Sequence, residues 1–321
     1  MIRSALIAAG PQAAHIAGLW WLMFWICLAV LLLVASALLI AVLRARVRGA
    51  AIVAEPQLDT DRRLEHRIGW TVVTCVVATI MVLFIFLVAS AVTGHRLALL
   101  ASDNALTIRL TGYRWWWKVQ YLDPTPARAV VTANEIHIPV GRPILINTQS
   151  QDVIHSFWVP ALHGKKDLVP GHPSSIWIQA DRPGRYEGQC AEFCGLQHAH
   201  MRLIVIAEPQ EKFDAWMEAQ RQPAKPPVDP LAQRGLNVFI TGPCALCHAI
   251  RGTDAAGQVA PDLTHLASRV TIGAGTLPNS AGNLAGWIID SQHIKPGNAM
   301  PPNSLSAEDL RGLLAYLGGL Q

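Results

Sequence analysis

The chain has 321 residues, of which 51% are apolar and only 15% carry a formal charge. A typical soluble chain is about 25% charged, so this composition argues against a wholly soluble protein and against a disordered one. The formal net charge of +4 is too small to indicate a nucleic-acid-binding surface, and we expect no nucleic-acid partner.

Two long apolar segments near the N-terminus predict membrane-spanning helices. Residues 16–43 and 68–94 contain no charged side chain over 28 and 27 positions, and about 20 apolar residues suffice to cross a bilayer as a helix. The loop 44–67 between them holds six arginines, so the positive-inside rule places this loop in the cytoplasm and both termini outside. We therefore expect residues 1–95 to form a transmembrane hairpin that carries the rest of the chain on the exported side.

Residues 96–208 predict an all-β sandwich or barrel. Short runs of alternating apolar residues are separated by turns rich in Pro, Gly and Asp, a pattern typical of such folds. The expected strands are 130–138, 144–148, 153–159, 175–179 and 202–207. A helix at 211–222 and the Pro-rich, extended segment 223–230 follow, so we expect residues 209–229 to connect two domains.

Residues 230–321 predict a small all-α domain. Helices are expected at 231–240, 284–291 and 306–317, the last of them capped by Ser306. The remainder of the segment is rich in Gly and Pro, so a domain of this size needs a stabilising group besides its hydrophobic core.

A segment of twelve residues between two expected strands gathers soft metal ligands. Cys190, Cys194, His198 and Met201 lie in this segment, and His155 lies on an expected strand 35 residues before Cys190. Thiolate, thioether and imidazole groups together favour copper, and two thiolates can bridge two copper ions with one imidazole on each. A structural zinc site and a disulfide between the two cysteines are the alternatives that the residues leave open.

The sequence Cys244-Ala-Leu-Cys247-His248 has the spacing of a c-type haem attachment site, with His248 as the proximal iron ligand. A redox-active Cys-x-x-Cys motif is the alternative, but that motif does not require the adjacent histidine. Met300 in a late Pro-rich loop is the expected second axial ligand, because a Met/His pair raises the reduction potential of a haem. The other candidates for this position are His265 and His293, each expected to be a surface loop residue.

These motifs together resemble subunit II of haem-copper cytochrome c oxidases of the caa type, in which a cytochrome c domain is fused to the chain. The resemblance covers roughly residues 15–208, and residues 230–321 resemble a class I cytochrome c domain. The motifs that carry it are C-x-E-x-C-G-x-x-H-x-x-M at 190–201, D-V-I-H-S-F at 152–157, K-D-L-V-P-G at 166–171 and Y-R-W-W-W-K at 113–118.

The resemblance implies a dinuclear CuA centre in a cupredoxin-like sandwich. The side chain of Glu192 would in addition contact a magnesium ion shared with subunit I, and Trp115 matches the tryptophan at which electrons enter from cytochrome c. The implied copper ligands are the bridging Cys190 and Cys194, the terminal His155 and His198, the axial Met201 and the main-chain carbonyl of Glu192.

Two positions depart from the pattern of the family. His172 stands where the family usually has an arginine after the Pro-Gly pair, which puts a contact with subunit I in doubt. Arg67 stands where many members have a glutamate associated with proton uptake, and the nearest acid is Glu65. Proton uptake by that route is therefore in doubt.

The expected function is electron transfer in a terminal respiratory oxidase of the bacterial cytoplasmic (inner) membrane. Electrons would pass from the chain's own c-type haem to CuA and on to subunit I, where oxygen is reduced to water and protons are translocated. Both redox domains would lie on the periplasmic side, and no oxygen-reducing site is expected on this chain. The expected partners are subunits I and III, the membrane, and an external cytochrome c or cytochrome bc complex. The alternatives are the small subunit of a CuA-type nitric oxide reductase and a membrane-anchored electron carrier or metal-transfer protein.

Overall fold

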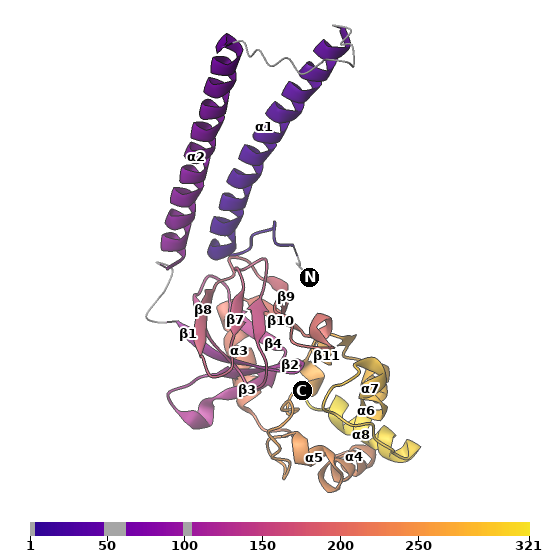
Figure 1. Cartoon of the computed structure of the whole chain (residues 1–321). Coiled ribbons are helices and arrows are strands. Elements are labelled where there is room, and N and C mark those ends of the chain that lie inside the picture. The colour runs from indigo at the N-terminus through magenta and orange to yellow at the C-terminus, as the bar shows by residue number, and fades with distance from the viewer. Residues whose placement is uncertain (1–3, 48–61, 99–104) are drawn as a thin grey trace. The chain divides into compact units, whose positions relative to one another are not determined.

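The computed structural model describes residues 4–47, 62–98 and 105–321. The chain forms two compact units, one of residues 15–99 and the other of residues 1–14 together with 100–321. Two long helices account for the first unit (Figure 1), namely α1 (Pro11–Val47) and α2 (Arg62–Ala98).

Both long helices have the length and composition of membrane spans. The most apolar 18-residue window of α1 has a mean hydropathy of 3.2 and that of α2 has 3.0, and no residue in either window is buried. The expected spans 16–43 and 68–94 lie inside these helices, and Glu65 and Arg67 lie in the first turns of α2. Most of the expected cytoplasmic loop 44–67 lies outside the described residues, and the orientation of the hairpin stays a prediction.

The β domain consists of two five-stranded sheets packed face to face, so the predicted all-β sandwich is confirmed (Figure 1). The first sheet has the strand order β3-β2-β1-β5-β8 and the second has the order β4-β10-β9-β6-β7. The strands are β1 (Leu106–Tyr113), β2 (Trp116–Tyr121), β3 (Val130–Ala133), β4 (Glu135–Pro139), β5 (Ile144–Ser150), β6 (His155–Trp158), β7 (Lys166–Leu168), β8 (Ser174–Ile178), β9 (Gly184–Cys190) and β10 (Arg202–Glu208). Single 3-10 turns lie at Pro126–Arg128 and His198–His200.

The expected strand 130–138 is wrong as a single element, because the chain changes sheets at Asn134. This residue has a φ of 63°, in the left-handed region that Asn tolerates better than most residues. Its side-chain oxygen accepts a hydrogen bond from the main-chain N–H of Trp117 at 2.9 Å. The bend ends β3 in one sheet and starts β4 in the other.

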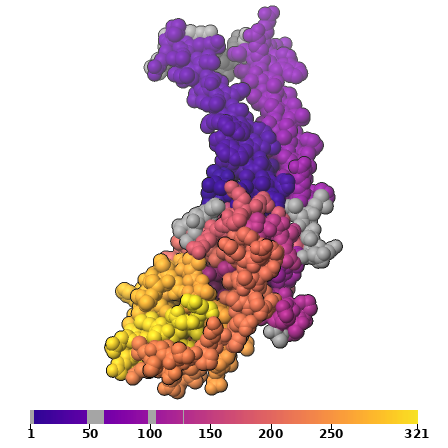
Figure 2. Space-filling model, turned by 180° about the vertical axis from the view of Figure 1, so that it is seen from behind, coloured from indigo at the N-terminus to yellow at the C-terminus, as the bar shows by residue number. Residues whose placement is uncertain are grey.

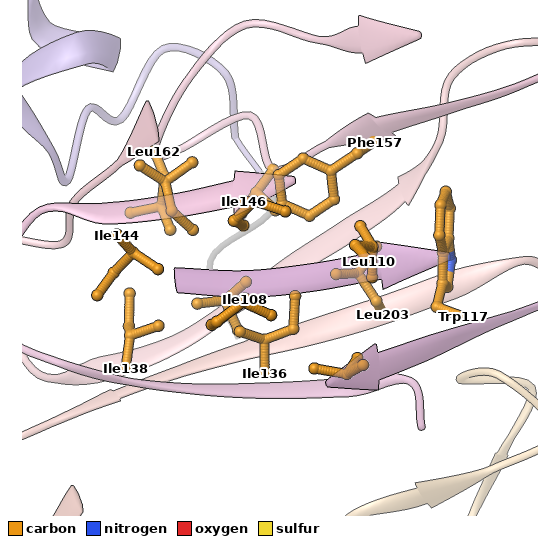
Figure 3. Packing of buried hydrophobic residues seen from close by; sticks show 14 of the residues in the cluster. Ile108, Leu110, Trp117, Ile136, Ile138, Ile144, Ile146, Phe157, Leu162 and Leu203 are labelled. Atoms are coloured by element: carbon orange, nitrogen blue, oxygen red, sulfur yellow. The ribbon is translucent and has the colours of Figure 1, made fainter. Parts of the chain in front are cut away.

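The core lies between the two sheets, where apolar side chains of alternate strand positions meet (Figure 3). Trp117 is the largest fully buried side chain of this core. Other fully buried members are Ile108, Leu110, Ile136, Ile138, Ile144, Ile146, Phe157, Leu162 and Leu203.

The C-terminal domain is helical, as predicted. Its helices are α4 (Pro230–Thr241), α5 (Cys244–Cys247), α6 (Ala281–Ile289), α7 (Ser291–Ile294) and α8 (Ala307–Gly318), with a 3-10 turn at Leu266–Ser268 and a short hairpin of β11 (Thr271–Ile272) and β12 (Leu277–Pro278). Helix α3 (Gln210–Arg221) and the Pro-rich segment precede them.

The ends of these helices follow from their capping residues. The expected Ser306 cap is present, since the N–H of Asp309 donates to the hydroxyl of Ser306 at 3.1 Å. The expected helix 284–291 is divided instead, because the carboxylate of Asp290 accepts the N–H groups of Gln292 and His293 and starts α7.

Helices α4 and α8 cross at two glycines. A Cβ atom built on Gly235 would lie 2.0 Å from the carbonyl oxygen of Gly312. This contact is too short for any side chain, so the two glycines set how closely the helices approach.

Replacing Gly235 by Ala is expected to destabilise the C-terminal domain by about 1–3 kcal/mol, because the added methyl group must separate α4 from α8. Gly282→Ala on α6 is the matched control, since a Cβ there meets no atom within 4 Å. Alanine is favoured over glycine in a helix by about 1 kcal/mol, so the control should be neutral or stabilising. Native-state hydrogen exchange of the α8 amides measures both effects, and wild-type protection in Gly235→Ala would contradict the close crossing.

Candidate metal centre and haem attachment site

Strand pairing brings the predicted copper ligands together at one end of the sandwich. His155 is the first residue of β6, and two positions later Phe157 pairs opposite Cys190, the last residue of β9. The main-chain N–H of Cys190 donates to the carbonyl of Met201 at 2.9 Å. This bond closes the loop 191–201, because it holds Met201 at the end of the loop next to Cys190 at its start.

Two buried thiols lie at the centre of this cluster. The sulfurs of Cys190 and Cys194 are 3.7 Å apart. The Nδ1 atom of His155 lies 3.9 Å from the Cys190 sulfur, and the Nδ1 atom of His198 lies 3.6 Å from the Cys194 sulfur. Two thiols and two imidazoles therefore converge on one volume, with one imidazole beside each sulfur.

Near each of the two sulfurs lies one further, weaker donor atom. The main-chain carbonyl of Glu192 accepts from the Cys190 thiol at 3.2 Å, and the Met201 thioether sulfur lies 3.9 Å from the Cys194 sulfur. The predicted donors thus form two similar sets, each with one sulfur, one imidazole and one weaker donor.

The two thiols are free and lie in contact with each other. Their separation far exceeds the roughly 2.05 Å of a disulfide bond, so the disulfide alternative is not formed here. The hydrogen bond between the two sulfurs is the largest cause that holds the pKa of Cys190 below its ordinary value. The same bond raises the pKa of Cys194. The thiolate is the form that binds metal, so the lowered pKa of Cys190 favours metal binding there.

Asp152 orients the His155 ring. The Nε2–H of His155 donates to the carboxylate at 2.8 Å, which leaves the lone pair of Nδ1 directed at the cluster. Burial alone raises the pKa of Asp152, but hydrogen bonds from His155 and from the N–H groups of Val153 and Arg114 bring it below its ordinary value. The carboxylate therefore stays ionised beside the ring.

The three consecutive tryptophans have different surroundings. Trp117 lies in the sandwich core, and Trp116 stacks on Tyr113 with 4.7 Å between ring centroids. Trp115 is 8% exposed and its indole N–H donates to the carbonyl of Cys194 at 3.0 Å. Trp115 is therefore the tryptophan bound to loop 191–201, which carries predicted copper ligands and is called the copper-ligand loop below.

The carboxylate of Glu192 lies at the surface of the β domain. It forms an ion pair with Lys165 at 3.2 Å, and His172 lies exposed in the same region. The magnesium contact expected of this carboxylate stays a prediction.

The haem attachment motif forms one short helix with its histidine at the end. Cys244 and Cys247 begin and end α5, and both thiols are free. The Nδ1–H of His248 donates to the carbonyl of Pro261 at 2.7 Å, so the lone pair of Nε2 is available to a metal. Burial is the main cause that lowers the pKa of His248, which keeps the ring neutral as a ligand requires.

Met300 lies in a loop held by hydrogen bonds. Its N–H donates to the side-chain oxygen of Asn298 at 2.8 Å, and its carbonyl accepts from the side chains of Ser291 and Gln292, each at 2.8 Å. These contacts fix the main chain from which the thioether extends.

The two alternative histidines have other positions. His265 is buried and its ring nitrogens lie within 2.9 and 3.2 Å of the carbonyls of Gln321 and Gln222, so the expectation of a surface loop residue is wrong. His293 is exposed on α7. Both nitrogens of His265 are engaged, which favours Met300.

Comparison with known proteins matches both the β domain and the C-terminal domain. Residues 106–208 match the family described as cytochrome c oxidase subunit II, periplasmic domain, and residues 232–321 match the cytochrome c family. Cytochrome c oxidase subunit 2 of Bacillus sp. (strain PS3) is 31% identical over 284 residues, which cover 83% of this chain and 76% of that protein. The chain belongs to the cytochrome c oxidase subunit 2 family.

Two further relatives carry similar descriptions. Cytochrome c oxidase subunit 2 of Alkalihalophilus pseudofirmus is 40% identical over 220 residues, which is 68% of this chain but less than two thirds, 62%, of that protein. Among solved structures, the periplasmic domain of subunit II of cytochrome oxidase of Bradyrhizobium japonicum is 29% identical, with a TM-score of 0.35, and covers 38% of this chain and 95% of that chain.

Membership of this family implies copper in the β domain and haem in the C-terminal domain. The donor set fits copper, because thiolate, imidazole and thioether groups are the soft and intermediate ligands that copper prefers. The fit extends to Met201, whose fully buried sulfur is directed at the cluster and has no use in a zinc site.

Three contacts of these sites were not predicted from the sequence. Asp152 was noted only as part of a motif, although its place three residues before His155 is a signal for a turn that brings carboxylate and ring together. Nothing in the sequence indicates that the carbonyl of Pro261 accepts a hydrogen bond from His248. Lys295 is the only lysine of residues 230–321 and is close to Met300 in the sequence. Neither property predicts that it contacts the β domain.

Asp152→Asn is expected to lower the copper affinity of the full chain by about 10–100-fold, because the amide keeps only one acceptor oxygen and no charge to hold the His155 ring. Asp214→Asn, on the exposed face of α3, is the matched control. Competition with a copper chelator measures both. Equal affinities in the two variants would show that Asp152 does not orient the ring.

Proposed function

We propose that the chain is the subunit through which electrons enter a terminal respiratory oxidase. They would pass from its own c-type haem to a dinuclear copper centre and on to subunit I, where oxygen is reduced to water and protons are translocated. The observation that carries this proposal is the convergence of two thiols, two imidazoles and two weak donors on a chain that also has a haem attachment motif.

The proposed copper ligands form two half-sites around a shared pair of sulfurs. A dinuclear centre of this kind supplies one-electron transfer with little change of geometry, because both metal ions share the charge. The protein holds its donors in place beforehand, since strand pairing fixes Cys190 and Asp152 fixes His155. The proposed ligands are Cys190 and Cys194 as bridges, His155 and His198 as terminal ligands, and Met201 and the carbonyl of Glu192 as axial ligands.

The proposed haem ligands are held in a similar way. Cys244 and Cys247 would bind the haem covalently, and the ring of His248 cannot rotate while its Nδ1–H donates to Pro261. Met300 would be the second axial ligand. Trp115 would be the residue at which electrons arrive at the copper loop, which its hydrogen bond to Cys194 supports.

The proposed partners are subunits I and III and an external cytochrome c or cytochrome bc complex. The oxygen-reducing site would belong to subunit I, and the Glu192 carboxylate would contact a magnesium ion shared with it. The two apolar helices support a two-pass anchor in the bacterial cytoplasmic membrane, and the arginines of residues 44–67 support an orientation with both redox domains on the periplasmic side.

The test of this function is the metal content of the full chain, matured with haem attachment, together with its electron paramagnetic resonance spectrum. We expect two coppers and one haem iron per chain, with hyperfine splitting from one electron shared by two copper nuclei. Cys194→Ser should abolish the shared spectrum, whereas Cys75→Ser in α2 should leave it unchanged. Zinc in the cluster, or a single copper with a mononuclear spectrum, would contradict the proposal.

Met300→His is expected to lower the reduction potential of the haem, because a thioether ligand raises the potential relative to an imidazole. His293→Ala is the control and should leave the potential unchanged, since that side chain is exposed on α7. A redox titration of the haem absorption bands measures both variants. A shift in the control and none in Met300→His would assign the ligand to His293 instead.

A further inference from the structure

Lys295 is a buried lysine that joins the C-terminal domain to the β domain. Its side chain is 2% exposed, and Nζ donates to the carbonyls of Trp115 and His200 in the β domain, each at 2.8 Å. A third bond, at 2.9 Å, goes to the carbonyl of Gly273 in its own domain. An ammonium group has three hydrogens, so every donor of Lys295 has an acceptor.

The residues after Lys295 continue the contact with the copper-ligand loop. The carbonyl of Pro296 accepts from the side chain of Gln197 at 2.8 Å. The indole of Trp115 lies against two glycines from different domains, because a Cβ built on Gly195 would be 3.2 Å, and one on Gly297 3.5 Å, from ring atoms. The loop that ends at Met300 therefore covers the tryptophan bound to Cys194.

A second group of contacts extends the same interface. The carboxylate of Glu135 in β4 accepts from the main-chain N–H groups of Val270 at 2.7 Å and Thr271 at 3.2 Å. The N–H of Arg202 in β10 donates to the carbonyl of Ala274 at 3.0 Å. Figure 2 shows the orange and yellow C-terminal residues packed against the β domain. Residues 270–275 and 295–297 thus form one continuous docking surface.

The buried charge of Lys295 favours one relative position of the two domains. Burying an unpaired ammonium group is very costly, and burial lowers the pKa of Lys295 to about 7. Three carbonyl dipoles directed at one nitrogen offset that cost only while both domains hold their acceptors in place. A shift of either domain leaves buried donors or acceptors unsatisfied, so the docked position is strongly preferred over neighbouring ones.

We propose that Lys295 is the positioning residue that fixes the haem domain on the copper-ligand loop, and that the haem domain thereby closes Trp115 to any other donor protein. The role given to Trp115 rests on the function proposed above, whereas the docking itself rests on the contacts alone. A covered Trp115 means that an external cytochrome meets this chain at the haem domain and not at the copper-ligand loop.

The amides that donate across the interface provide a direct test. Hydrogen exchange of the full chain in its assembled complex is followed at Arg202, Val270 and Thr271. Lys295→Met keeps the length of the side chain but has no donor, so exchange at these amides should rise at least about tenfold. Lys225→Met is the matched control, because this lysine is exposed in the Pro-rich segment, and it should change nothing.

Hydroxyl-radical footprinting tests the closure of Trp115. Oxidation of Trp115 should rise several-fold in Lys295→Met, while the partly exposed Trp177 of β8 serves as the internal reference. Unchanged exchange or unchanged Trp115 oxidation in Lys295→Met would overturn the proposal. Faster exchange of the α8 amides would overturn it as well, because Lys295 would then be needed for the fold of the haem domain and not for its docking.

Neither readout depends on electron transfer. A metal content that contradicts the proposed function therefore leaves the docking result intact, and a failure of docking leaves the metal content intact. Metal content therefore tests the proposed function alone, whereas hydrogen exchange and footprinting test the docking alone.

Discussion

Two buried sulfurs, held 3.7 Å apart without a disulfide bond, are the feature on which the proposed copper site of the β domain depends. Cys190 is fixed because it ends β9, which pairs with β10 on one side and with β6 on the other. Cys194 lies on the loop, where its carbonyl is fixed by the indole of Trp115. A disulfide would shorten this separation and leave no thiol to bind metal, so the proposed copper site needs the two sulfurs close together and unbonded. The paired strands and the closed loop 191–201 hold them at this separation.

The same loop has two roles on its two faces. Its inner face carries the proposed copper ligands, and its outer face carries the contacts of Gln197 and His200 with the C-terminal domain. Trp115 connects these roles, because its indole N–H contacts Cys194 and its own carbonyl accepts from Lys295. The haem domain therefore contacts the copper-ligand loop itself and not a surface far from the proposed copper site. Small residues at Gly195 and Gly297 permit this close approach.

The sequence predicted what is encoded locally and missed what depends on distant partners. The two apolar helices, the copper-ligand motif and the haem motif each lie within a short window, so hydropathy and spacing were enough. Strand β9 was missed because only Tyr186 among its residues has a large apolar side chain, and it is a strand because neighbours on both sides pair with it. The division at Asn134 and the contacts of Lys295 were missed for the same reason. Two acceptors of Lys295 lie 180 and 95 residues away along the chain.

The chemistry of the docking surface also determines how it responds to its surroundings. Encounters between proteins that are steered by exposed charges slow steeply as salt increases, because ions screen those charges. The acceptors of Lys295 are neutral carbonyls, and the side chains of Lys295 and Glu135 are both buried, so added salt has little to screen. A tether alone would give the haem domain an effective concentration on the order of millimolar. The docking proposed above would remove this search, and the haem domain would then not leave the copper-ligand loop to collect electrons. An external donor would therefore approach the free surface of the haem domain, and that surface, not the β domain, would select the donor.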